Sequence, residues 1–180
     1  MVIQPKVTVE DFEAFIYAPE NADRSFELIG GEIVEVVSNS YSSEIGAFFV
    51  ALLIQWGRST GRVTGADGGY VIMDERYIPD AAYISKKRQP EPSRAAYNPN
   101  APDLAVEVLS PAKSPAEMRI KVANYVLAGT VVWVVDPDKQ RVEVYTPGAA
   151  PKILGIDDTL DGGDILPDLR AAVKTSLQNR

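Results

Sequence analysis

The chain has 180 residues, of which 46% are hydrophobic and 24% charged, so we expect one domain over residues 1–180 with its own core. The formal net charge of -7 counts against a protein that coats nucleic acid, but it is compatible with a small basic groove. The sequence has no cysteine and no histidine, which excludes disulfides, thiolate metal sites and the Ser-His-Asp triad. Any metal must therefore be held by oxygen ligands, as Mg²⁺, Mn²⁺ and Ca²⁺ are.

Three features of the sequence bear on the compartment in which the protein resides. The N-terminal stretch lacks the basic-then-apolar pattern of a secretion signal. No apolar run approaches the roughly 20 residues that a membrane-spanning helix needs. Together with the absence of cysteine, these features predict a cytoplasmic protein that has no membrane partner.

The first half of the chain is predicted to contain two helices with a hairpin between them. Thr8 is a candidate N-cap for a short amphipathic helix. Residues 26–37 form two short apolar runs around Gly30-Gly31, a pair typical of a two-residue hairpin turn. Apolar residues at helical spacing follow Ile45, and this second helix is predicted to end near Gly61.

The second half alternates predicted strands with helices. The expected order is strands within 61–85, a proline-containing loop over 89–101, a strand over 104–109, a helix over 115–128, a hairpin over 131–146 and a last helix from about Leu169. Ser114, with Pro115 and Glu117 after it, has the pattern of a helix N-cap. A helix between two strands indicates a parallel crossover, so we predict an α/β (α+β) fold with a mixed sheet flanked by helices.

Carboxylates in apolar strands are the main functional signal. In the stretch APDLAVEVLSP, Asp103 and Glu107 share one strand face with Ala105, while the opposite face is apolar. Asp80 likewise stands beside small residues, in the predicted strand ERYIPDAAYIS that precedes this one. One interpretation is an edge strand whose acids are solvated. The other is a central strand, in which a buried carboxylate needs an ion-pair partner or a metal.

Lys121 is the candidate basic residue. It follows Lys113 and Glu117 at helical spacing, and a solvated Glu117–Lys121 pair is its simplest interpretation. However, the predicted crossover returns this helix across the sheet, so that Lys121 could also point at Glu107.

Several segments together resemble the Uma-type restriction endonuclease family of the PD-(D/E)XK nuclease superfamily. The resemblance runs from about Thr8 to Leu169, and it is carried by FELIGGEIVEVV, PDAAYIS, APDLAVEVLSP, KVANYVLAGT and VVWVVDPDKQRVEVY. It implies a restriction-endonuclease-like fold and a metal-dependent nuclease that acts on DNA with Mg²⁺ or Mn²⁺. It also makes a homodimer plausible, since small nucleases of this kind often pair to address two strands.

The resemblance assigns roles to individual residues. It implies Asp80, Glu107 and Lys121 as catalytic residues, with Asp80 and Glu107 as metal ligands and Glu44 as an additional one. In the PD-(D/E)XK motif the lysine should stand two residues after Glu107, where this chain has Leu109. In the Uma-type family the lysine lies on the following helix, and Lys121 matches that position.

The chemistry fits these residue types. A divalent cation lowers the pKa of a bound water and polarises the phosphoryl oxygen, and two carboxylates with the Val108 carbonyl could hold it. Lys121 would orient or deprotonate the water, or stabilise developing charge. The run Lys86, Lys87 and Arg88 is either a phosphate-backbone contact or a solvated charge run.

Two other functions remain open at this point. The fold could act as a catalytically silent module that binds nucleic acid or protein, which the negative net charge favours. A generic stable domain with solvated acids is the third reading, and it predicts that Asp80, Glu107 and Lys121 lie far apart.

Overall fold

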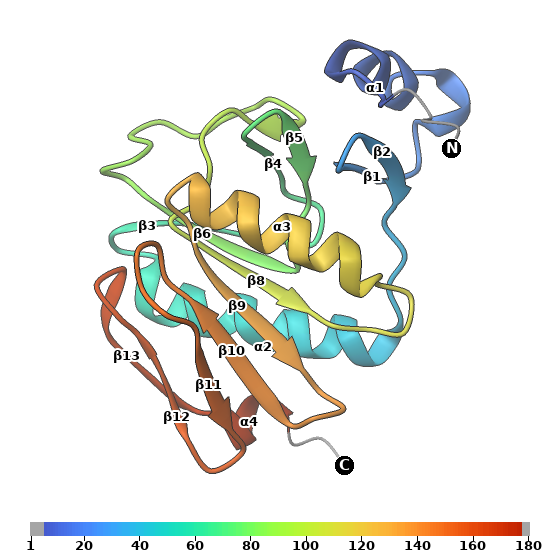
Figure 1. Ribbon diagram of the computed structural model, residues 1–180. Coiled ribbons are helices and arrows are strands. Elements are labelled where there is room, and N and C mark those ends of the chain that lie inside the picture. The colour runs from blue at the N-terminus through green and yellow to red at the C-terminus, as the bar shows by residue number, and fades with distance from the viewer. Residues whose placement is uncertain (1–5, 178–180) are drawn as a thin grey trace.

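The computed structural model describes residues 6–177 (Figure 1). A six-stranded sheet forms the centre, in the order β11-β10-β9-β8-β6-β3. Its strands are β3 (Gly61–Gly65), β6 (Ala81–Ser85), β8 (Leu104–Val108), β9 (Val131–Asp136), β10 (Arg141–Tyr145) and β11 (Lys152–Gly155). Strand β8 is buried throughout and has β6 antiparallel on one side and β9 parallel on the other. The acids of β8 therefore lie in a central strand, and the solvated-edge interpretation is wrong.

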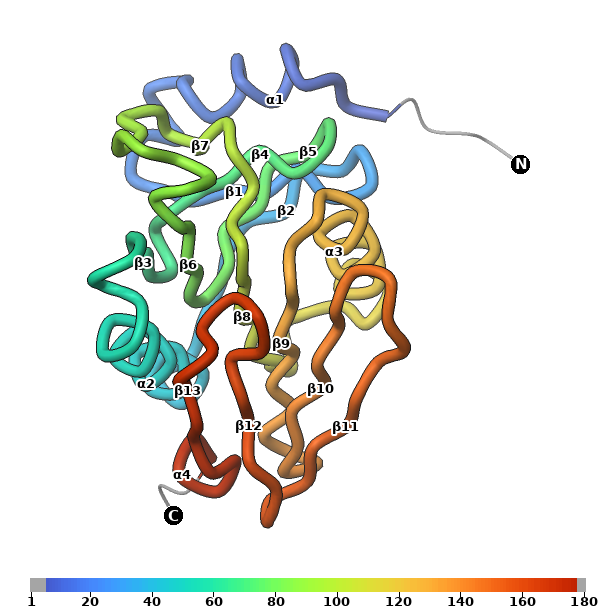
Figure 2. The backbone as a smooth tube through the Cα atoms, turned by 90° about the vertical axis from the view of Figure 1, so that its left-hand side faces the viewer, coloured from blue at the N-terminus to red at the C-terminus, as the bar shows by residue number. Residues whose placement is uncertain are grey.

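Two helices cover the two faces of this sheet. Figure 2 shows α2 (Ser40–Gly57) on one side of β8 and α3 (Pro115–Leu127) on the other. Helix α3 makes the predicted crossover from β8 to the parallel strand β9. Ser114 caps α3 as predicted, since its hydroxyl accepts hydrogen bonds from the Ala116 and Glu117 amides, and Pro115 is the first helical residue.

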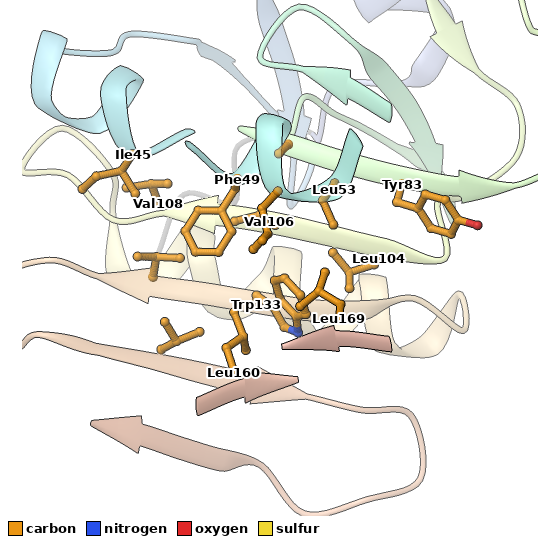
Figure 3. Close-up of a cluster of buried hydrophobic side chains, with 14 of the residues drawn as sticks. Ile45, Phe49, Leu53, Tyr83, Leu104, Val106, Val108, Trp133, Leu160 and Leu169 are labelled. Atoms are coloured by element: carbon orange, nitrogen blue, oxygen red, sulfur yellow. The ribbon is translucent and has the colours of Figure 1, made fainter. Parts of the chain in front are cut away.

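The face toward α2 is a fully apolar core. Phe49 and Leu53 of α2 lie over Val106 and Leu104 of β8, with Trp133 of β9 beside them (Figure 3). The ring of Phe49 meets that of Trp133 edge to face, with 6.1 Å between the ring centroids. This core fixes which side of β8 faces α2, and alternation along the strand then directs Glu107 to the opposite side.

On the face toward α3, β6 and β8 each contribute a buried alanine. Ala82 and Ala105 are buried there, together with Met118 and Tyr125 of α3. Because alanine fills little volume, this layer has room for long polar side chains between the sheet and α3. The charged cluster described below lies in this layer.

A second sheet, in the order β2-β1-β5-β4-β7, holds the N-terminal hairpin. Its strands are β1 (Phe26–Ile29), β2 (Glu32–Glu35), β4 (Gly69–Ile72), β5 (Glu75–Tyr77) and β7 (Tyr97–Asn98). Gly30 and Gly31 both have positive φ, as a two-residue turn between β1 and β2 requires, so this predicted hairpin is confirmed. Helix α1 (Val9–Ile16), capped by Thr8 as predicted, packs on this sheet through Phe12, and a 3-10 turn follows at Pro19–Asn21.

Some predicted boundaries were wrong. Leu169, the expected start of the last helix, lies in strand β13 (Leu166–Ala172), which pairs with β12 (Thr159–Gly162). Helix α4 is short, over Val173–Leu177. Helix α2 ends at Gly57, and the predicted endpoint Gly61 instead begins β3. Within residues 6–177, none of the helices combines the length and apolar character needed to cross a bilayer.

Candidate active site

Asp80 and Glu107 face each other across neighbouring strands. The antiparallel register of β6 and β8 pairs Ala81 with Val106, and continuing it by one residue places Asp80 opposite Glu107. The Asp80 Oδ2 atom accepts a hydrogen bond of 2.6 Å from the Val108 amide, which fixes its side chain toward β8. Like charges directly opposite each other destabilise a sheet. Two carboxylates in this arrangement therefore need a cation.

Lys113 supplies one such cation. Its Nζ atom lies 2.6 Å from Asp80 Oδ2 and 3.3 Å from Glu107 Oε2. Lys113 belongs to the connection between β8 and α3, and its side chain is 24% exposed. One ammonium nitrogen thus reaches both acids, which shows that their oxygens converge on a single point.

Lys121 is the second cation, on the other side of Glu107. Its Nζ atom lies 2.6 Å from Glu107 Oε1 and 2.8 Å from Glu27 Oε1, and its side chain is only 3% exposed. The solvated Glu117–Lys121 pair is therefore wrong, because Lys121 is buried and pairs with Glu27 and Glu107. The Tyr125 hydroxyl also donates to Glu107 Oε1, at 3.1 Å.

The electrostatics of the cluster follow from this pairing. Burial by itself raises the pKa of Glu107, but the ammonium groups of Lys121 and Lys113 outweigh it and hold that pKa below its ordinary value. For Glu27, burial prevails over Lys121, and the nearby Glu107 charge adds to it, so its pKa is raised. Burial lowers the pKa of Lys113, but Glu107 and Asp80 raise it overall. Glu107 is therefore ionised at neutral pH despite complete burial.

The structure brings Asp80, Glu107 and Lys121 into one cluster, which contradicts the reading of three solvated, distant charges. The sequence analysis missed Glu27 and gave Lys113 no role. Glu27 could have been found by the argument used for Glu107, because it too is an acid within an apolar strand. Lys113 has helical spacing with Glu117 and Lys121, but it lies in the irregular connection before α3, so the spacing did not predict its contact with Asp80.

Asp103 directly precedes β8, at the end of the strand opposite to Glu107. Its carboxylate accepts a hydrogen bond from the Ser85 amide and pairs with Arg88, at 3.1 Å from Nε. Arg88 also donates to the carbonyls of Ala101 and Pro102, while Lys86 donates to the Ser59 carbonyl. The run of Lys86, Lys87 and Arg88 thus follows β6 at the end away from Asp80. Nucleic-acid binding by these three residues stays a prediction.

Glu44 lies on α2, and its side chain is exposed. It lines a small hollow together with Thr175, Ser176 and Leu177 at α4. Asp80, by contrast, lines a hollow of about 210 Å³ shared with Glu27, Lys113 and Lys121. A role for Glu44 as an additional metal ligand stays a prediction.

The donor set of the cluster fits a hard divalent cation. The carboxylate oxygens of Asp80 and Glu107 are ligands that Mg²⁺ and Mn²⁺ take, and both already contact one cationic group. Within residues 6–177, no cluster of three or more acidic side chains has the geometry of a metal site. Two carboxylates with the Val108 carbonyl and water would therefore form the donor set, which suits Mg²⁺ because it keeps several waters.

Comparison with solved structures defines the class of fold. A crystal structure described as a putative nuclease belonging to DUF820 from Anabaena variabilis ATCC 29413 matches with a TM-score of 0.82 and 22% sequence identity. The match covers 95% of this chain and 97% of that chain. The predicted α/β (α+β) fold, with mixed sheets flanked by helices, is therefore confirmed.

The family follows from the sequence comparison. The model of the Uma2 family, described as putative restriction endonuclease, matches residues 9–174, so the chain belongs to this family. This confirms the resemblance found in the sequence. A comparison of this sequence with curated proteins found no match.

Proposed function

We propose that the chain is a metal-dependent endonuclease that hydrolyses phosphodiester bonds in DNA. The observation that carries the proposal is the pair of Asp80, directly before β6, and Glu107 of β8, which both contact one ammonium group. Membership of a family described as restriction endonucleases supports DNA as the polymer.

In this proposal Asp80 and Glu107 hold Mg²⁺ or Mn²⁺, aided by the Val108 carbonyl. The cation would polarise the phosphate and lower the pKa of a bound water. Lys121 keeps Glu107 ionised, because its ammonium group is buried against that carboxylate. The Tyr125 hydroxyl fixes the orientation of the same carboxylate by its hydrogen bond.

The charge balance of the cluster supports this assignment. Three carboxylates, those of Glu27, Asp80 and Glu107, face the two ammonium groups of Lys113 and Lys121. With all three carboxylates ionised, one negative charge is left over in a largely buried part of the molecule, and either a proton on Glu27, whose pKa is raised, or an additional cation would compensate it. An uncompensated buried charge is costly, so an additional cation is favoured there.

We also propose a homodimer, which sedimentation velocity would test.

The test combines metal binding with DNA cleavage. Mn²⁺ and Mg²⁺ are titrated calorimetrically into the wild-type protein, Glu107→Ala and the control Asp157→Asn, and the same three proteins are incubated with supercoiled plasmid. Asp157 is exposed in a turn, so its substitution removes one negative charge away from the cluster. We expect metal binding and metal-dependent nicking in the wild type and the control, and neither in Glu107→Ala.

The outcomes separate the proposed function from its rival. If the wild type binds no metal, the metal-site account fails. Metal binding without any nicking would favour the catalytically silent module that binds nucleic acid or protein. Circular dichroism of Glu107→Ala shows whether its loss of binding comes from unfolding.

A further inference from the structure

The two lysines of the cluster differ in how they are held. Lys121 lies on α3 and is almost completely buried between Glu27 and Glu107. Lys113 lies in the connection before α3, and about a quarter of its side chain is exposed. Lys121 is therefore fixed inside the protein, while Lys113 has access to molecules that approach from outside.

We infer that Lys113, rather than Lys121, is the lysine that contacts the scissile phosphate. The inference rests on the proposed nuclease function. A cation held between Asp80 and Glu107 would take the point where the Lys113 ammonium group now lies, and the displaced ammonium group would remain within reach of a phosphate attached to that cation. Lysine is suited to this change of partner, because its charge is carried on a flexible four-carbon stem.

The shape of the surface supports this role. Lys113 lines both the hollow of about 210 Å³ at Asp80 and a larger hollow of about 920 Å³ between α3 and the β9–β10 hairpin. The larger hollow has apolar walls that include Met118 and Val122, with charged side chains such as Lys139 at its rim. Lys113 thus borders both hollows, and its ammonium group reaches the acids from there.

Lys121 is poorly placed for the same task. If its ammonium group moved to a phosphate, Glu27 and Glu107 would lose the cation between them, and both are buried. Removing one member of a buried ion pair is strongly destabilising. Lys121 is therefore a positioning residue that acts through Glu107.

Four proteins test the inference: wild type, Lys113→Met, Lys113→Arg and the control Lys152→Met, a change at an exposed lysine on β11. Each is analysed by thermal unfolding, by calorimetric Mn²⁺ titration and by single-turnover plasmid nicking at saturating Mn²⁺. We expect Lys113→Met to fold and to bind Mn²⁺ at least as tightly as the wild type, because a competing cation has been removed. Its nicking rate should fall by about a hundredfold, the effect of losing one charge-stabilising group. Lys113→Arg should retain an intermediate rate.

The outcomes that overturn the inference are distinct from failure of the nuclease proposal. A wild-type protein that nicks no DNA with Mn²⁺ bound contradicts the proposed function before any variant is compared. If the wild type is active, Lys113→Met nicking at the wild-type rate overturns the role of Lys113. Weaker Mn²⁺ binding by Lys113→Met also overturns the inference, because Lys113 would then help to form the metal site instead of being displaced by the cation. The Lys152→Met control should match the wild type in all three measurements.

Discussion

Lys121 and Glu107 form a completely enclosed ion pair, with 2.6 Å between Nζ and Oε1 and side-chain exposures of 3% and 0%. Lys121 also neutralises Glu27, which reaches it from β1. The helix α3 is thereby tied both to the six-stranded sheet and to the N-terminal hairpin. The pair explains how two acids can lie in buried strands, and it makes the stability of the protein depend on one lysine.

Lys121→Met should destabilise the protein by about 3–5 kcal/mol, because it leaves Glu107 and Glu27 buried without their cation. Urea unfolding measures the change. The matched control Lys152→Met removes an exposed lysine and should change stability by less than about 0.5 kcal/mol. An equal decrease of the unfolding free energy in Lys121→Met and Lys152→Met would show that the buried ion pair does not contribute to stability. Adding Glu27→Gln to Lys121→Met should restore part of the loss, since one unpaired charge disappears.

Stability in acid should depend on Glu107. Its pKa in the folded protein lies below the ordinary value of 4.5, so the stability it contributes is present above that pH and is lost as the pH falls toward the folded value. Glu27 has the opposite sign, because its raised pKa makes its contribution more favourable on acidification. We therefore expect the difference in unfolding free energy between wild type and Glu107→Gln to shrink from pH 7 to pH 3. A difference that stays constant over this range would contradict the lowered pKa, and Asp157→Asn serves as the exposed control.

Gly57→Ala should destabilise the protein although alanine favours helices. A Cβ atom at Gly57 would lie 2.7 Å from Cε2 of Tyr83, which is buried and hydrogen-bonded through its hydroxyl to Thr60. Overpacking of this kind costs about 1–3 kcal/mol, more than the roughly 1 kcal/mol that alanine gains in a helix. In the control Gly65→Ala, the new Cβ meets Val50 Cγ2 at an ordinary 3.6 Å. Thermal unfolding of both variants measures the effect, and a more stable Gly57→Ala would refute it.

Mg²⁺ should stabilise the folded protein if Asp80 and Glu107 hold it. A ligand at a hundred times its Kd raises the unfolding free energy by about 2.7 kcal/mol. The shift in Tm with Mg²⁺ should be absent in Asp80→Asn and present in Asp157→Asn. An equal shift in Asp80→Asn would place the bound cation elsewhere.

Periodicity and a capping pattern were enough to predict β8, α3 and β9 at the centre of the fold. The alternation in residues 104–108 predicted which face of β8 carries Glu107, and the capping pattern at Ser114 predicted the start of α3. The crossover between β8 and β9 followed from these elements. The encounter of Glu107 with Lys121 could be anticipated for the same reason, because α3 must return across the sheet.

The remaining features depend on contacts that no local pattern specifies. Residues 166–172 contain helix-forming side chains, yet pairing with β12 makes them the strand β13. Strand β11 has only two apolar residues, Ile153 and Leu154, and is defined by its pairing with β10. Lys113 meets Asp80 through the course of an irregular connection, and Glu27 meets Lys121 across 94 residues of chain. Such long-range pairs are set by tertiary packing.

The separation along the chain of the residues in the charged cluster has a consequence for folding. Glu27 lies in β1 of one sheet and Glu107 in β8 of the other, with Asp80 directly before β6, and Lys121 joins them only when α3 has docked on both sheets. Contacts between such distant segments require the closure of long loops, which slows their formation. We therefore expect the charged cluster to be completed late, after the core around α2 has brought the central strands together. The pairing of Glu27 with Lys121 would thus report the final docking of the N-terminal hairpin rather than the collapse of the chain.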